Sequence, residues 1–305
     1  MKYYLTLITA FILIINLMAC ASSETEQQSE PIASSDTQLD NDKVSKTETK
    51  SAKDIKPSEI IEYKNIDGIS LSLHVFYPQD HKATDNTPAM VFFHGGGWNG
   101  GSPHHFYRQS QHLANKGMVA ISAQYRVKKQ HNTTPKESLK DGKSAMRWVR
   151  SHAQELGINP NMIAAGGGSA GGHVAAATGT ATAFEEDTDD KSISYRPDAL
   201  VLFNPVFDNG PGGYGHGSVK AYWQQFSPLH NVTKDTPPTI GMFGEKDTAI
   251  KVKSALKFET LMKEFGTTVE VHIYKDQPHG FFNEAKYDET VLAMDKFLTK
   301  QGFIQ

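Results

Sequence analysis

Short apolar runs alternate with longer segments of helical periodicity along most of this chain. Every second residue from Ile69 to Tyr77 is apolar, which is typical of a strand with one buried face. The turn Asp67-Gly68 separates this strand from a second expected strand at residues 59–66. Continuous apolar runs predict buried strands at residues 89–93, 118–123, 162–165, 199–203, 239–243 and 269–274.

Helical periodicity appears between these strands, at residues 138–156, 170–183, 250–265 and 286–300. This alternation predicts an α/β fold with a mostly parallel central sheet that is covered by helices on both faces. Residues 58–305 are enough for one such domain with a substantial core. In sheets of this kind, the loops that carry catalytic residues lie at the carboxyl ends of the strands.

The first 57 residues have a different character. Residues 1–19 combine a short positive head with an apolar run of signal-peptide length, shorter than the roughly 20 residues of a membrane-spanning helix. Leu17-Met18-Ala19-Cys20 resembles a bacterial lipobox. The resemblance implies cleavage before Cys20, lipidation of this cysteine and export as a lipoprotein, facing the periplasm or bound to the outer membrane. The alternative is ordinary cleavage after Ala21, which would release a secreted protein.

Residues 20–57 are rich in Ser, Thr, Glu, Gln, Asp and Lys and show no apolar periodicity. Such a composition cannot bury enough surface to offset the chain entropy, so we expect a disordered tether. The sequence therefore divides into a signal peptide (1–19), a tether (20–57) and a folded domain (58–305).

Charge and cysteine content narrow the function. The formal net charge is −3, and residues 58–305 carry only −1 of it, because the excess acid lies in the tether. The chain therefore lacks the basic surface that nucleic-acid binding requires, and its near-neutral domain suits neutral small molecules. Cys20 is the only cysteine, which excludes an intramolecular disulfide and a cysteine-based zinc site.

Two glycine-rich motifs follow predicted strands. Gly167-Gly168-Ser169-Ala170-Gly171 is a G-x-S-x-G sequence between a strand and a helix, which is the context of a nucleophile elbow. The start of that helix brings backbone amides, including that of Ala170, near Ser169 Oγ, where negative charge would develop. His94-Gly95-Gly96-Gly97-Trp98 is an HGGG-type loop, which supplies the second part of an oxyanion hole.

A nucleophilic serine also needs an unprotonated imidazole and a carboxylate that orients it, in the chain order Ser, acid, His. His279 fits best among the 13 histidines, because it lies just beyond the strand at 269–274. Asp247 follows the strand at 239–243 and is the preferred acid. Glu245 and Asp276 are the alternatives.

HGGGW, GGGSAGGH, GEKD and QPHGF occur in an order that resembles the α/β-hydrolases of the hormone-sensitive-lipase and short-chain acetyl esterase group. The resemblance runs from about Ile60 to the C-terminus. It implies the α/β-hydrolase fold, the catalytic residues Ser169, Asp247 and His279, and an oxyanion hole of the Gly96, Gly97 and Ala170 amides. The helical N-terminal cap of that family is missing, so any lid must come from residues 181–197 or 205–237.

The resemblance implies a serine carboxylesterase that hydrolyses short acyl esters, with acetyl groups on a carbohydrate as the leading expectation. Such an enzyme needs no metal or organic cofactor, and we expect contact with a membrane only through the lipid anchor. The sequence leaves the oligomeric state open. His104, Tyr214 and Trp223 are candidates for substrate binding, because they lie in loops after the strands at 89–93 and 199–203. The alternatives are an exported serine peptidase or amidase of the same fold, and a non-catalytic surface-binding module.

Overall fold

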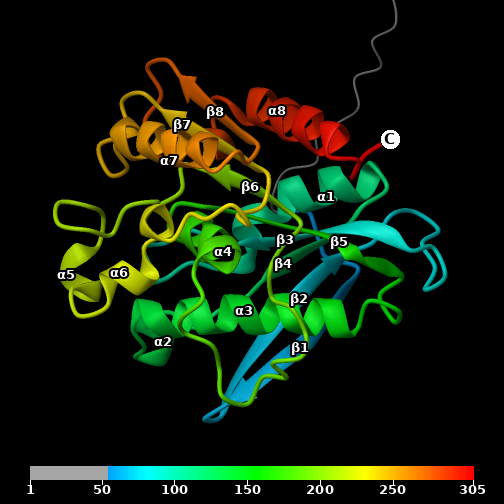
Figure 1. Cartoon of the computed structure of the whole chain (residues 1–305). Helices are drawn as coiled ribbons and strands as arrows, with labels where there is room; N and C mark the ends of the chain where they lie inside the picture. The colour runs from blue at the N-terminus through cyan, green and yellow to red at the C-terminus, as the bar shows by residue number, and fades with distance from the viewer. Residues whose placement is uncertain (1–53) are drawn as a thin grey trace, which may run out of the picture. The chain divides into compact units, whose positions relative to one another are not determined.

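The computed structural model describes residues 54–305, so the signal peptide, Cys20 and most of the expected tether lie outside the described residues. Eight strands form one sheet in the order β1-β2-β4-β3-β5-β6-β7-β8 (Figure 1). The strands are β1 (Glu59–Ile66), β2 (Ile69–Phe76), β3 (Thr87–Phe93), β4 (Val119–Ala123), β5 (Ile158–Gly168), β6 (Ala199–Phe203), β7 (Thr239–Gly244) and β8 (Val269–Tyr274).

β1 and β2 form an antiparallel hairpin, and β2 pairs antiparallel with β4. All other neighbouring strands in the sheet are parallel. The hairpin turn uses Asp67 and Gly68, both with positive φ (51° and 76°), a conformation that matches the twist of paired strands. The parallel strands align their carboxyl ends along one edge of the sheet, and the site described below lies at that edge.

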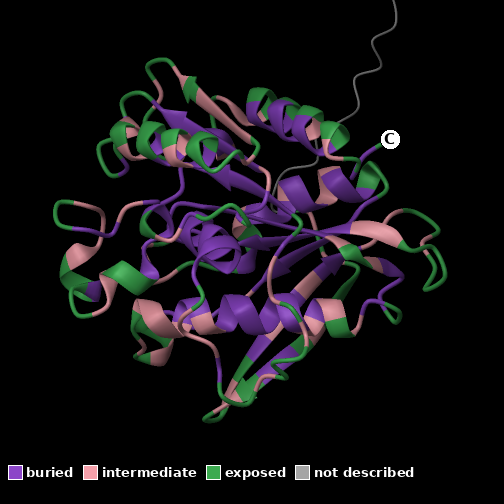
Figure 2. Cartoon of the chain, in the orientation of Figure 1, coloured by how far each residue is buried: buried purple, intermediate pink, exposed green. Residues whose placement is uncertain are grey.

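Helices cover both faces of the sheet. The longer helices are α1 (Tyr107–Asn115), α3 (Pro135–Ser151), α4 (Ala170–Thr180), α7 (Val252–Glu264) and α8 (Tyr287–Lys300). Short turns of helix are α2 (Lys128–His131), α5 (His216–Val219), α6 (Trp223–Phe226), η1 (Pro103–Phe106), η2 (Pro228–His230) and η3 (Phe281–Asn283). In Figure 2 the central strands are mostly buried and α4 is buried along its whole length, whereas the outer helices are buried along one side only.

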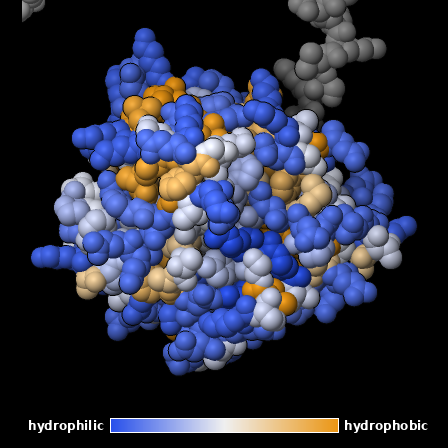
Figure 3. Space-filling model, in the orientation of Figure 1, coloured by the Kyte–Doolittle hydropathy of each residue, from blue (hydrophilic) through white to orange (hydrophobic). Residues whose placement is uncertain are grey.

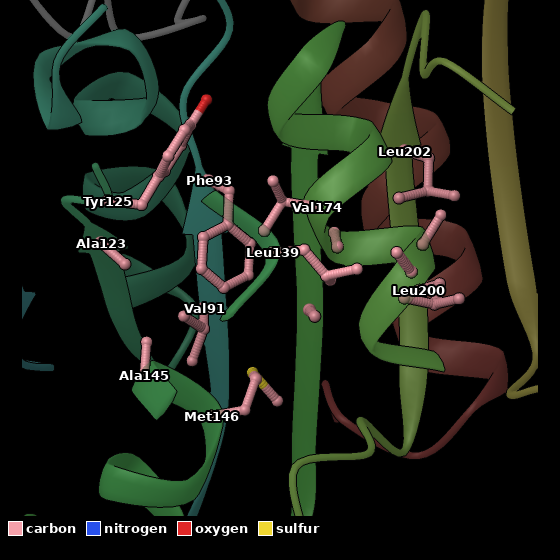
Figure 4. Close-up of a cluster of buried hydrophobic side chains, with 14 of the residues drawn as sticks. Val91, Phe93, Ala123, Tyr125, Leu139, Ala145, Met146, Val174, Leu200 and Leu202 are labelled. Atoms are coloured by element: carbon pink, nitrogen blue, oxygen red, sulfur yellow. The ribbon is translucent and has the colours of Figure 1, made fainter. Parts of the chain in front are cut away.

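The core consists of two apolar layers, one on each face of the sheet. Residues of β3 alternate between them, because side chains of a strand point to opposite faces. Val91 and Phe93 pack in the layer under α3, α4 and α7, and Phe92 packs in the layer under α1 and α8. Figure 4 shows the first layer, where Val91 and Phe93 lie close to Leu139 of α3 and Val174 of α4.

The predicted fold class is confirmed, since the mostly parallel sheet carries helices on both faces. Each expected strand is present with small shifts at its ends. α3 begins at Pro135, three residues before the expected start, behind a capping box of Thr134 and Glu137. α1 was not predicted, because two of its buried positions are the polar residues Gln109 and Ser110, which weaken the apolar pattern.

A buried ion cluster ties together β1, the segment after β4, α3 and the loop at residues 185–189. Asp141 is fully buried and accepts hydrogen bonds from Lys64 Nζ at 2.7 Å and from Arg126 Nη2 and Nε, both at 2.8 Å. Glu186 accepts from the same Lys64 and Arg126, each at 3.0 Å. Both carboxylates of this cluster therefore have cationic partners, as buried charges require.

Within residues 54–305, none of the helices combines the length and the apolarity needed to cross a lipid bilayer. The face in Figure 3 is mostly hydrophilic, with apolar residues in small groups.

Candidate active site

Ser169 occupies a sharp turn between β5 and α4. Its backbone has φ 55° and ψ −121°, a conformation that a residue with a side chain seldom adopts. The flanking glycines are sterically required: a Cβ on Gly167 would lie 2.6 Å from the Gly171 backbone, and one on Gly171 would lie 2.1 Å from the Phe93 carbonyl oxygen. The G-x-S-x-G sequence therefore lets the serine project at the carboxyl edge of the sheet while α4 packs closely against β3.

The structure brings Ser169, His279 and Asp247 together from three separate loops. His279 Nε2 lies 3.0 Å from Ser169 Oγ, and His279 Nδ1 lies 2.6 Å from Asp247 Oδ2. Ser169 is only 9% exposed and Asp247 only 5%, whereas the His279 side chain is 34% exposed. The serine hydroxyl thus meets an imidazole whose far nitrogen is held by a carboxylate, the arrangement of a nucleophile, a base and an orienting acid.

Asp247 is kept ionised by its hydrogen bonds. Burial alone would raise the pKa of this carboxyl, but hydrogen bonds from His279 and from the amides of Ile250 and Ala249, with the charge of His279, lower it below its usual value. The alternative acids face elsewhere. Glu245 Oε2 accepts the Asp276 amide at 3.0 Å, and Asp276 pairs with Lys246 at 2.7 Å, so neither carboxylate contacts His279.

The HGGG loop lies against the elbow. Gly96 and Gly97 have φ of 124° and 64°, and a Cβ on Gly96 would lie 2.2 Å from the Gly100 carbonyl oxygen, so this backbone path requires glycine. Among the described residues, no group accepts a hydrogen bond from the Gly96 or Gly97 amide. His94 stabilises the loop: its ring stacks on Tyr125 at 4.1 Å, and Tyr125 donates its hydroxyl proton to the His94 carbonyl oxygen at 2.6 Å.

The three candidates for substrate binding are placed very differently. Tyr214 lies beside the loop, since a Cβ on Gly97 would be 3.0 Å from its hydroxyl, and its ring is 5.7 Å from Trp98. His104 is exposed and lies against Tyr107, with ring centroids 4.5 Å apart. Trp223 packs edge-on against His230 at 4.8 Å. No hydrogen bond or ring contact joins His104 or Trp223 to Ser169, Asp247 or His279.

A cavity of about 400 Å³ is lined by Tyr214 and by Thr248, the residue after Asp247. One wall is the glycine-rich segment at residues 206–214, and the other is formed by the loop at residues 248–251 and the start of α7. The glycine-rich wall is held by internal hydrogen bonds, including that from the Tyr214 amide to the Asp208 carbonyl oxygen at 3.0 Å. Tyr214 therefore links this cavity to the loop of Gly96 and Gly97.

From the sequence, His105 was expected in a solvated loop after the HGGG motif rather than in the site, and Asn204 was not predicted as a site residue. His105 Nδ1 accepts the Gly95 amide at 2.8 Å, and burial together with the charge of His279 lowers the pKa of its imidazole to about 4. Asn204 is fully buried after β6, and its side-chain oxygen accepts the Gly280 amide at 3.3 Å, next to His279. The only available signal was position, since both residues follow strands that point into the site.

A metal-binding arrangement of three or more His, Cys, Asp and Glu side chains was not found in residues 54–305. The architecture and the three-loop site define an α/β-hydrolase fold. A BD-FAE family model matches residues 73–208, and a dienelactone hydrolase family model matches residues 210–300. Together these two matches extend from β2 to α8.

Solved structures and curated relatives agree on the class. Esterase 2 of Thermogutta terrifontis is 37% identical, covers 81% of this chain and 95% of its own, and superposes with a TM-score of 0.78. Carboxylesterase NlhH of Mycobacterium tuberculosis is 33% identical over 42% of this chain, and an acetylxylan esterase of Xylanibacter ruminicola is 26% identical over 63%. The chain belongs to the carboxylesterase family of α/β-hydrolases. It spans 40% of the length of NlhH and 41% of that of the acetylxylan esterase.

Proposed function

We propose that this protein is a serine carboxylesterase with Ser169 as nucleophile, His279 as general base and Asp247 as orienting acid. The observation that carries the proposal is the continuous chain of hydrogen bonds from Ser169 to Asp247. Ser169 Oγ lies 3.0 Å from His279 Nε2, and His279 Nδ1 lies 2.6 Å from Asp247 Oδ2. A serine hydroxyl is a weak nucleophile by itself, and a neighbouring imidazole that a carboxylate orients is the arrangement that activates it.

In the proposed reaction, His279 Nε2 takes the proton from Ser169 as Oγ attacks the ester carbonyl carbon. The amides of Gly96, Gly97 and Ala170 donate hydrogen bonds to the resulting oxyanion, and each such donor is worth roughly 3 kcal/mol in the transition state. His279 then protonates the departing alcohol. The same imidazole then deprotonates a water molecule, which attacks the acyl-enzyme, and passes this proton to Ser169 Oγ as the carboxylic acid leaves, so the serine and the neutral imidazole are both restored.

We infer that the acyl group is short, with acetyl as the leading candidate, and that the alcohol is a carbohydrate or a similar polar group. Two observations on relatives support a short acyl group: structures of the Thermogutta esterase hold propionate or butyrate, and one relative is an acetylxylan esterase. The cavity beside Tyr214 is large enough for a sugar ring, and an aromatic residue at its edge suits stacking on a sugar.

The test compares the full-length protein with Ser169→Ala on p-nitrophenyl esters from acetyl to dodecanoyl. We expect the highest kcat/KM on acetyl or propionyl esters and a loss of at least 10³-fold in the variant. Acetate release from acetylated xylan then tests the carbohydrate. Preference for long chains would overturn the short-acyl proposal. Cleavage of peptide or amide substrates alone, with no ester hydrolysis, would favour the peptidase alternative.

We also propose that the protein is exported and anchored by lipid on Cys20. The proposal rests on the lipobox-like sequence, which lies outside the described residues, and on the position of the only cysteine. Mass spectrometry of the native N-terminus should find an acylated Cys20, and Cys20→Ser should release the protein from the membrane fraction. An unmodified N-terminus at Ser22 would establish ordinary secretion instead.

A further inference from the structure

The side chain of His105 lies between the HGGG loop and the segment that carries His279. Its Nδ1 accepts the amide proton of Gly95 at 2.8 Å. The ring also packs on this peptide, because a Cβ on Gly95 would lie 3.0 Å from His105 Cε1. Gly95 is buried, and among the described residues no other group accepts its amide proton. His105 therefore supplies, among the described residues, the one acceptor for the amide of the His94–Gly95 peptide, which precedes the peptides of Gly96 and Gly97.

The backbone of His105 is fixed to the other half of the site. Asn283, four residues after His279, donates its side-chain amide to the His105 carbonyl oxygen at 2.9 Å. The same side chain accepts from Gln109 Nε2 at 2.6 Å, which ties α1 to η3. The rings of His105 and Phe282 lie 5.4 Å apart. Thus His105 connects the loop of the expected oxyanion donors with the segment of the expected base.

This hydrogen bond requires one protonation state. Nδ1 can accept a proton only when it carries none, so the ring must be neutral with its proton on Nε2. The titratable groups that face His105 are His279 from the segment before η3 and His94 from the loop after β3. Burial and the charge of His279 lower the pKa of His105 to about 4, so the accepting form persists at neutral pH.

We propose that His105 is a positioning residue of the esterase, which fixes the Gly95 peptide through Nδ1 and thereby orients the Gly96 and Gly97 amides toward the oxyanion. This inference rests on the proposed function. It assigns His105 no contact with the reacting atoms. An amide that is misdirected by a small rotation of the Gly95 peptide stabilises the oxyanion less, while binding of the neutral ester is little affected.

A matched pair of substitutions tests the proposal. Asparagine places its Oδ1 on Cγ, where histidine carries Nδ1, so His105→Asn keeps an acceptor for the Gly95 amide. Glutamine places its polar atoms one bond farther out, so His105→Gln loses the acceptor while it keeps a similar volume. We expect His105→Gln to lower kcat for p-nitrophenyl acetate at least 30-fold with KM changed less than twofold, and His105→Asn to stay within about threefold of the wild-type kcat. His272→Gln, a histidine on the edge strand β8, serves as the control and should match the wild type.

A merely structural role would predict another result. If both variants lose kcat equally, or if KM rises while kcat stays, the proposal is wrong. Thermal unfolding of each variant identifies losses that reflect misfolding. ¹⁵N-histidine NMR tests the hydrogen bond itself, without an activity measurement. The two ring-nitrogen resonances that disappear in His105→Gln belong to His105. We expect them to show a protonated Nε2 and an unprotonated Nδ1. A protonated Nδ1 would overturn the proposal for His105. Inactivity on every ester would instead overturn the proposed function, and the NMR result would still decide separately whether Nδ1 accepts the Gly95 amide.

Discussion

Residues that lie one or two positions apart in the sequence have quite different environments near Ser169. Asp247 meets His279, while Glu245, two positions earlier, points to the Asp276 amide at the surface. His105 faces the HGGG loop, while His104 packs on Tyr107. Residue type alone does not explain these differences. The backbone direction at the end of each strand decides which of two similar side chains enters the site.

Asp247→Asn tests the orienting role at this scale. The side-chain amide of asparagine would donate to His279 Nδ1, which favours the tautomer with its proton on Nε2 and leaves no base for Ser169. We expect kcat to fall by about 10³- to 10⁴-fold, as for other triads of this kind, with little change in KM. Steady-state kinetics on p-nitrophenyl acetate provide the measurement.

Glu245→Gln is the matched control, because it removes a carboxylate from the same loop without touching His279. It should keep at least half of the wild-type kcat. If Glu245→Gln inactivates the protein and Asp247→Asn does not, the assignment of the acid is wrong.

The sequence predicted the residues that meet at Ser169 because each lies in a motif with a defined position after a strand. It did not predict His105. Nothing in Pro103-His104-His105-Phe106 indicates which histidine turns inward. These four residues form the short 3-10 helix η1, and its orientation decides which histidine faces the site. That orientation depends on the packing of Phe106 against the sheet. The same limit applies to Trp223: its aromatic character suggested a substrate contact, which stays a prediction, and its ring packs edge-on against His230.

At the scale of elements, the nucleophile turn depends on close contact between α4 and β3. Gly171→Ala would place a methyl group 2.1 Å from the Phe93 carbonyl oxygen and 2.3 Å from that of His94, both backbone atoms. The helix must shift to accommodate it. We expect the free energy of unfolding to fall by about 3 kcal/mol and kcat to fall at least 100-fold. Urea unfolding and ester hydrolysis measure the two effects.

Gly217→Ala is the comparison, because the added methyl group on α5 meets no atom within 4 Å. It should leave both the unfolding free energy and kcat at wild-type values. Equal effects of the two substitutions would mean that glycine at position 171 is not required by packing.

Asp141→Asn tests the ion cluster that joins β1, α3 and the loop at residues 185–189. The substitution keeps the shape of the side chain but removes its negative charge. The buried cations of Lys64 and Arg126 then lack one of their anionic partners. We expect a loss of about 3–5 kcal/mol in unfolding free energy, the usual cost of removing one partner of a buried pair. Glu259→Gln, which breaks the exposed pair with Lys263, should cost less than about 1 kcal/mol. A small effect of Asp141→Asn would show that the cluster is well hydrated in solution.

Period-two alternation and continuous apolar runs identified the eight strands, because strands buried on both faces tolerate few polar residues. The short helices α2, α5 and α6 were not predicted, since a helix of four residues has no periodicity to detect. The antiparallel pairing of β2 with β4 also could not be read from apolar patterns, which do not encode partners.

At the scale of the whole molecule, burial lowers the pKa values of three largely buried histidines. Burial lowers the pKa of His94 and of His105 to about 4 and that of His173 to about 3. In the unfolded chain each would titrate near 6.5. Between these values the unfolded state binds protons that the folded state does not, so acidification favours unfolding.

We therefore expect the unfolding free energy to fall as the pH drops from about 6.5 to about 4, by up to about 4 kcal/mol per pH unit. Urea unfolding at a series of pH values between 7.5 and 5 measures the slope. A stability that stays constant from pH 7.5 to pH 5 would contradict the buried, neutral state of these side chains.

The order of strands in the sheet has a consequence for the time course of folding. The HGGG loop and Ser169 follow β3 and β5 in the middle of the sheet, but Asp247 and His279 follow β7 and β8, the last two strands at one edge. A partly folded chain that has completed only β1 to β5 would hold the nucleophile without its base. Recovery of esterase activity during refolding should therefore lag behind the burial of tryptophan at Trp98, and would report the docking of the last strand rather than the initial collapse.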